Sequence, residues 1–183
     1  MNKGKFIVIS GPSGVGKDTI CEELVRRGNG IYSVSMTTRK KRSGEIDGVN
    51  YFFVNKEEFE RHIEEDYFLE YAMYNGNYYG TPTDFISDNT NRGINVFAVL
   101  EINGAINVKK IFPSAITIFI MPPSFDELER RLRGRKSEDD DIINERLNIA
   151  KEEVKYKDKY DYVVINSTVD NAVLEIENII NNC

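Results

Sequence analysis

The stretch GPSGVGKDT, residues 11–19, decides the fold, because it follows the apolar run FIVIS of residues 6–10 and opens a helical pattern. This order predicts a strand, a tight loop and a helix N-terminus. The glycines permit positive φ angles and let backbone N–H groups approach phosphate oxygens, assisted by the positive end of the helix dipole. We therefore expect a triphosphate-binding loop made of Gly11, Pro12, Ser13, Gly14, Val15, Gly16, Lys17, Asp18 and Thr19.

One position departs from the usual GxxxxGK[ST] pattern of such loops. Asp18 stands where a hydroxyl normally meets Mg²⁺, and the hydroxyl of Thr19 comes one residue later. A carboxylate beside a triphosphate is repelled unless something offsets its charge. We hypothesise that Asp18 faces Mg²⁺ or its waters, because this cation prefers oxygen ligands, while Thr19 serves the α-phosphate.

Composition limits the possible classes of protein. A chain of 183 residues, 40% of them hydrophobic, can form one α/β domain. A net charge of −6 argues against a general polyanion binder, so we expect no nucleic-acid partner. Cys21 and Cys183 form no disulfide framework, and the N-terminus has too few apolar residues for a membrane span, so we expect a cytoplasmic protein that does not bind membranes. The single histidine, His62, lies in a charged stretch and is expected at the surface.

Apolar runs and helical stretches alternate along the chain. This alternation predicts an α/β fold of the P-loop NTPase type, with a doubly wound parallel sheet. The expected strands are residues 6–10, 94–100, 115–121 and 160–166, and the expected helices are residues 18–27, 82–91, 104–111, 124–133, 138–156 and 169–180.

Two segments interrupt the alternation. Residues 35–79 are rich in Arg, Tyr and Gly and predict a small mixed subdomain where a ligand could enter. Residues 134–144 are almost wholly polar or charged and predict a mobile lid. Arg131, Arg135 and Arg146 frame this lid and could stabilise a migrating phosphoryl group, although helical arginines are usually solvated.

The basic run of residues 39–42 has two interpretations. It could be a localisation or nucleic-acid patch. Its neighbours favour another interpretation, in which Arg39, Arg42 and Tyr51 converge on one small anionic group, the arginines as charged forks and the tyrosine as a hydroxyl donor.

Four ordered motifs make nearly the whole chain resemble a guanylate kinase. They are SMTTRKKRSGEIDGVNYFFV (35–54), FLEYAMYNGNYYGTP (68–82), PPSFDELERRLRGR (122–135) and ERL (145–147). The resemblance implies phosphoryl transfer from ATP to GMP or dGMP with Mg²⁺. It also implies an ATP-binding core (residues 1–34, 84–133 and 147–183), an inserted GMP-binding subdomain (35–83) and a lid (134–146).

The same resemblance assigns roles to individual residues. Lys17, Arg131, Arg135 and Arg146 would be catalytic, and Asn166 and Ser167 would lie near the adenine. The GMP site would consist of Ser35, Arg39, Arg42, Tyr51, Glu70, Tyr79 and Thr81. Guanine presents adjacent N1–H and N2–H donors, and one carboxylate can accept both, so we expect Glu70 to select the base.

The chain departs from the family pattern at several positions. Where members commonly have EIDxQG, this chain has Glu101, Ile102, Asn103 and Gly104, and Lys136 replaces a glycine of the lid. The sequences GKD (16–18) and ING (102–104) resemble those of ribose 1,5-bisphosphate phosphokinases, which share the fold. Such a phosphokinase is therefore one alternative function. A second alternative is a protein-binding guanylate-kinase-like module, but such modules typically have a degraded phosphate loop, whereas this loop is intact.

Overall fold

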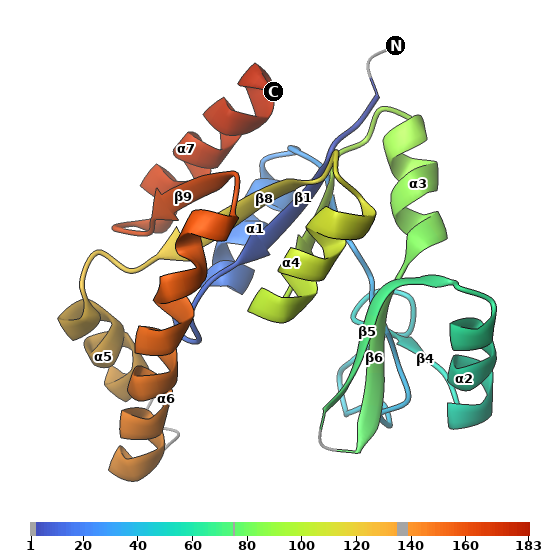
Figure 1. The fold of residues 1–183 in the computed structure, drawn as a ribbon, viewed down its shortest axis with the longest axis horizontal. Helices are drawn as coiled ribbons and strands as arrows, with labels where there is room; N and C mark the ends of the chain where they lie inside the picture. The colour runs from blue at the N-terminus through green and yellow to red at the C-terminus, as the bar shows by residue number, and fades with distance from the viewer. Residues whose placement is uncertain (1–2, 75, 135–138) are drawn as a thin grey trace.

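The computed structural model describes residues 3–74, 76–134 and 139–183. Its centre is a parallel five-stranded sheet in the order β2-β7-β1-β8-β9. Figure 1 shows β1, β8 and β9 of this sheet between the covering helices. Four of these strands match the four apolar runs, so the predicted doubly wound sheet is confirmed. Strand β2 has only two residues, too few to show any periodicity. The strands are β1 (Phe6–Ser10), β2 (Ile31–Tyr32), β7 (Val96–Val99), β8 (Ile116–Met121) and β9 (Tyr162–Ile165).

Helices cover both faces of this sheet because the side chains of β1 alternate between them. Ile7 and Ile9 pack against α1 and α7 on one face, whereas Phe6 and Val8 pack against α3 and α4 on the other. All five residues of β1 are buried, which is typical of a central parallel strand. The covering helices are α1 (Lys17–Arg26), α3 (Thr83–Asn91), α4 (Ile102–Ile111) and α7 (Val169–Asn182).

A helical pair projects from one end of the molecule. Helix α5 (Phe125–Gly134) packs its Leu128 and Leu132 against Ile143 and Leu147 of α6 (Asp140–Glu153). The helix expected over residues 138–156 begins at Asp140 and continues after Glu153 as a 3-10 helix, η1 (Val154–Lys159). The proposed lid, residues 134–146, thus includes the first half of α6, but residues 135–138 lie outside the described ranges.

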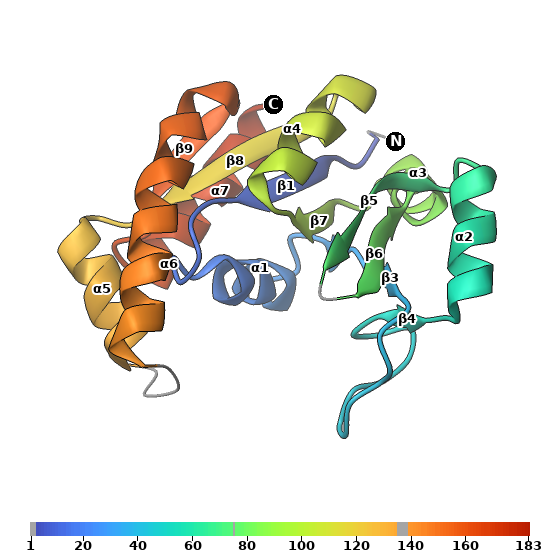
Figure 2. The ribbon, with the colours of Figure 1, turned by 60° about the horizontal axis from the view of Figure 1, so that its bottom comes forward.

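A second, four-stranded sheet lies at the opposite end from α5 and α6 (Figure 2). Its strand order is β4-β3-β6-β5, and β3 is parallel to β4 but antiparallel to β6. Helix α2 packs on it through Phe59, whose ring stacks on Phe68 at 4.3 Å and on Tyr78 at 5.1 Å. The elements are β3 (Met36–Thr37), β4 (Phe52–Phe53), α2 (Lys56–Glu64), β5 (Phe68–Tyr74) and β6 (Asn77–Pro82).

His62, which was expected at the surface, is half-buried: its side chain is 17% exposed and its ring stacks on Tyr67 at 4.4 Å. Among the described residues, no helix has the length and apolar content that a membrane crossing needs.

Candidate active site

The loop between β1 and α1, residues 11–16, is called the glycine loop below. All three of its glycines have a positive φ and a neighbouring atom within 3 Å of where a Cβ would lie; Gly14, with a φ of 83°, faces Cδ2 of Leu132 at 2.6 Å. Gly11 has a φ of 141°, and a Cβ there would lie 2.3 Å from the carbonyl oxygen of Ile120. Gly16 has a φ of 98°, and a Cβ there would lie 2.8 Å from Nδ2 of Asn166. No side chain caps α1, so the N–H groups of its first turn are available to an anion.

Lys17 lies at the start of α1 and folds back over the glycine loop. Its Nζ donates hydrogen bonds to the carbonyl oxygens of Gly11 at 2.6 Å and Pro12 at 3.2 Å. Burial lowers the pKa of Lys17, and the carboxylates of Glu101, Glu153 and Asp18 oppose this effect. The ammonium is therefore a partly desolvated positive charge centred on the loop.

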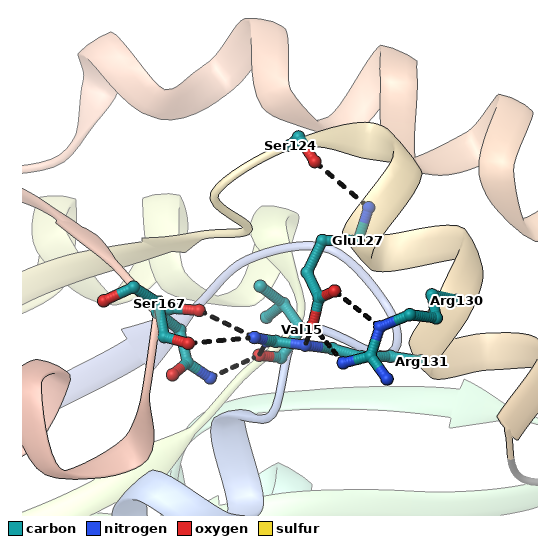
Figure 3. Close-up of polar contacts among 7 residues, drawn as sticks. Val15, Ser124, Glu127, Arg130, Arg131 and Ser167 are labelled. Atoms are coloured by element: carbon teal, nitrogen blue, oxygen red, sulfur yellow. Dashed lines mark hydrogen bonds and ion pairs between the residues drawn. The ribbon is translucent and has the colours of Figure 1, made fainter.

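Arg131 of α5 and Asn166, just after β9, hold the glycine loop by hydrogen bonds, and Figure 3 shows Arg131 between Val15 and Ser167. The Nη2 of Arg131 donates to the carbonyl oxygens of Asn166 at 2.9 Å and Ser167 at 3.5 Å, and its Nη1 donates to that of Val15 at 3.4 Å. The Nδ2 of Asn166 donates to the same Val15 oxygen at 2.8 Å. The predicted catalytic Arg131 and the predicted adenine-side residues thus lie together against the loop.

Glu127, which sequence reasoning missed, orients Arg131. Its Oε1 accepts from Nε of Arg131 at 2.8 Å, and both carboxylate oxygens accept from Arg130. These hydrogen bonds lower the pKa of Glu127 to about 2. An acid four residues before an arginine on a helix is a recognisable signal, but its relation to the loop is not visible in the sequence.

Glu153, at the end of α6, is a second residue that the sequence did not single out. Burial raises the pKa of its carboxyl group, and the positive charge of Lys17 and the N–H of Ser13, which donates to it, oppose this rise. Its Oε2 is buried and has no hydrogen-bond partner among the described residues. Helix α6 therefore brings a carboxylate to the back of the glycine loop.

The remaining lid arginines are placed differently. Arg135 lies outside the described residues. Arg146 is half-buried in α6, one turn before the buried Ala150. Of these two arginines, which are expected to stabilise the migrating phosphoryl group, the structure describes Arg146 only.

A cluster in the second sheet gathers several predicted acceptor-site residues. The guanidinium of Arg39 forms a bidentate ion pair with Glu45, in which Nη2 donates to Oε1 at 2.6 Å and Nη1 donates to Oε2 at 3.0 Å. Its Cζ lies 5.4 Å from the ring centre of Tyr51, which is 6.0 Å from the ring of Tyr79. Burial raises the pKa of Tyr51, so its hydroxyl stays protonated and able to donate.

Glu45 is the acceptor-side residue that sequence reasoning missed. Besides pairing with Arg39, its carboxylate accepts the backbone N–H of Arg42 at 2.7 Å, and these contacts lower its pKa. Arg42 itself is exposed. Glu45 thus fixes the planar guanidinium of Arg39 in one orientation.

Glu70 and Thr81 are cross-strand neighbours on β5 and β6. The Thr81 hydroxyl donates to Oε1 of Glu70 at 2.8 Å. Burial raises the pKa of Glu70, and this hydrogen bond opposes the rise. Thr81 thereby anchors one carboxylate oxygen and leaves the other free of that contact.

A cleft of about 610 Å³ lies between elements of the core and the segments just before and after β3. Asp18 and Tyr32 line its core side, and Ser35, Glu45 and Tyr51 line the other. Asp18 and Thr19 are both exposed at the start of α1. Within the described ranges, no three His, Cys, Asp or Glu side chains gather as a ready-made metal site.

Comparison with known proteins gives consistent results. The family model described as guanylate kinase matches residues 3–183. A guanylate kinase of Halalkalibacterium halodurans is 49% identical over 179 residues, covering 97% of this chain and 88% of the relative. A guanylate kinase of Shouchella clausii is 50% identical, with coverages of 97% and 87%. The crystal structure of guanylate kinase from Anaplasma phagocytophilum superimposes with a TM-score of 0.75 at 34% identity, covering 99% of this chain and 86% of the other.

Proposed function

The chain belongs to the guanylate kinase family and is a nucleoside monophosphate kinase, and we propose that it transfers the γ-phosphoryl group of Mg²⁺-bound ATP to GMP or dGMP. The observation that carries this proposal is the glycine loop with Lys17 on the core and the Arg39, Tyr51 and Tyr79 cluster on the second sheet. These are two sites suited to anions, on separate parts of one molecule.

The donor nucleotide would occupy the glycine loop. Backbone N–H groups and Lys17 would hold its β- and γ-phosphates, and Asn166 and Ser167 would lie beside the adenine. No protein cluster is built to hold a metal alone among the described residues, which suits a Mg²⁺ that arrives with ATP and keeps phosphate and water ligands. The exposed carboxylate of Asp18 would face the Mg²⁺ or its waters, and the exposed hydroxyl of Thr19 would serve the α-phosphate.

The acceptor nucleotide would occupy the second sheet. Arg39, Arg42, Tyr51 and Tyr79 would hold its phosphate, with Ser35 beside them, because guanidinium and phenol groups donate to phosphate oxygens. Glu70 would accept both donors on the Watson–Crick edge of guanine, with Thr81 holding the carboxylate in place.

The chemical task of the chain is positioning and charge stabilisation. The phosphate of GMP has a second pKa of about 6 and is largely dianionic at neutral pH, so the attacking oxygen needs no general base. Lys17 would exchange its loop carbonyls for phosphate oxygens, and Arg131, Arg135 and Arg146 would stabilise the charge that spreads over the migrating group.

We also propose the domain boundaries implied by the sequence. The core would comprise residues 1–34, 84–133 and 147–183, the GMP-binding part residues 35–83 and the lid residues 134–146. The second sheet, from Met36 to Pro82, falls inside the GMP-binding part. The expected cytoplasmic location and the absence of nucleic-acid partners remain proposals of the same kind.

A turnover assay tests the function directly. ADP formation from ATP is measured with GMP, dGMP, AMP, CMP, UMP or ribose 1,5-bisphosphate as acceptor. We expect turnover with GMP and dGMP and little with the others. Preference for ribose 1,5-bisphosphate would identify the related phosphokinase activity, and absence of any turnover would favour a protein-binding module.

A further inference from the structure

The first turn of α4 lies close to the carboxylate of Glu70. A Cβ built on Gly104 would lie 3.3 Å from Oε2 and 3.7 Å from Cδ of Glu70. The other oxygen, Oε1, accepts from Thr81. The carboxylate of Glu70 therefore lies between the hydroxyl of Thr81 on β6 and the backbone of Gly104 on α4.

The backbone conformation does not explain a glycine at this position. Gly104 is the third residue of α4 and is not among the glycines with positive φ. In a helix interior, alanine is more favourable than glycine. A side chain at residue 104 would instead press on Oε2 of Glu70, a half-buried carboxylate whose other oxygen, Oε1, is tied to Thr81, and would push Oε2 aside by a few tenths of an ångström.

We infer that Gly104 is a specificity-determining positioning residue, whose missing side chain leaves both oxygens of Glu70 in place for a purine base with two adjacent N–H donors. This inference rests on the proposed GMP site. Guanine has the N1–H and N2–H donors, whereas hypoxanthine has the same ring with N1–H alone. In the inferred arrangement Oε2 accepts from N2–H and Oε1 from N1–H, so displacing Oε2 weakens GMP binding and leaves the single contact of IMP in place.

Gly104→Ala tests the inference in the full-length protein. Calorimetric titration with GMP and with IMP gives the ratio of their dissociation constants. We expect affinity for GMP to fall about tenfold, the effect of losing one hydrogen bond to a charged group, and affinity for IMP to fall much less. In steady-state assays, the change should lie in KM for GMP rather than in kcat.

Two further variants identify the route of the effect. Asn107→Ala, an exposed position one turn further along α4, should leave the GMP to IMP ratio unchanged. In a Glu70→Ala background, Gly104→Ala should cause no further change in the ratio, because the group that it displaces is gone. Thermal unfolding checks that Gly104→Ala is folded under the conditions of the titrations.

The outcomes separate this inference from the proposed function. If the unaltered protein neither binds nor phosphorylates GMP, the proposed function fails. If the unaltered protein prefers GMP over IMP and Gly104→Ala retains that preference in full, the role of Gly104 is overturned. An equal drop in the ratio with Glu70 absent would also reject it, because the effect would not pass through Glu70.

Discussion

Lys17 is the residue whose charge the donor site depends on most. Its ammonium is held by two loop carbonyls and partly desolvated, so it can move onto phosphate oxygens without crossing bulk water. We expect Lys17→Ala to lower kcat for GMP phosphorylation by about a thousandfold or more, as loss of a group stabilising transition-state charge does. GMP binding, measured by titration, should remain within about twofold of the unaltered protein because the acceptor site is separate. Persistent transfer would disprove the phosphate role.

Glu70 is the residue on which base selection should depend. Glu70→Gln keeps an oxygen that can accept from Thr81 but replaces one acceptor with a donor. We expect the preference for GMP over AMP, expressed as a ratio of kcat/KM values, to fall by about tenfold to a hundredfold. An unchanged ratio would show that another group selects the base.

The titration of Glu70 adds a pH dependence. Burial raises its pKa, so the carboxyl group takes up a proton at a higher pH than an ordinary glutamate does. The protonated form accepts only weakly from N–H donors, and affinity for GMP should therefore fall as the pH is lowered through this raised pKa. The phosphate of GMP also titrates, with a second pKa of about 6, so the comparison is with Glu70→Gln, whose pH profile should retain only the phosphate component.

At the scale of elements, helix α5 contributes to the donor site through Glu127, which orients Arg131. Glu127 orients Arg131 against the glycine loop, whereas Glu129 on the same helix pairs with Arg133 at 2.8 Å and is 41% exposed. We expect Glu127→Gln to raise KM for ATP by about threefold to tenfold, the cost of weakening one charge-assisted hydrogen bond, with KM for GMP unchanged. Glu129→Gln is the matched control. Equal effects of the two changes would indicate a general loss of helix stability.

The elements also show what the sequence could and could not predict. The core strands and the glycine loop follow from local pattern, because burial on both faces makes strand residues uniformly apolar and the loop requires glycines. The strands β2, β3 and β4 have two residues each. Such short strands show no periodicity in the sequence and are defined only by their hydrogen bonds to neighbouring strands. The contacts of Glu45, Glu127 and Glu153 arise from packing, and a single acidic residue in a sequence is most often a solvated charge.

At the scale of the whole molecule, the two nucleotide sites would belong to separate parts joined around the cleft. If each ligand binds its own part, each should slow amide hydrogen exchange there first, since a ligand stabilises the structure that it binds. A non-hydrolysable ATP analogue should protect residues 11–26, and GMP should protect the second sheet, residues 36–53 and 68–82. At 100 times its Kd, each ligand stabilises the folded state by about 2.7 kcal/mol.

The two ligands together should do more than the sum of their separate effects. Phosphoryl transfer requires the γ-phosphate and the acceptor phosphate to meet in line, and the cleft of about 610 Å³ lies between elements of both parts. We therefore expect the radius of gyration, measured by X-ray scattering, to decrease only when both nucleotides are present. Full contraction with the ATP analogue alone would mean that closure is driven by the donor site and does not depend on the acceptor, because a ligand shifts a conformational equilibrium only by its differential affinity for the two states.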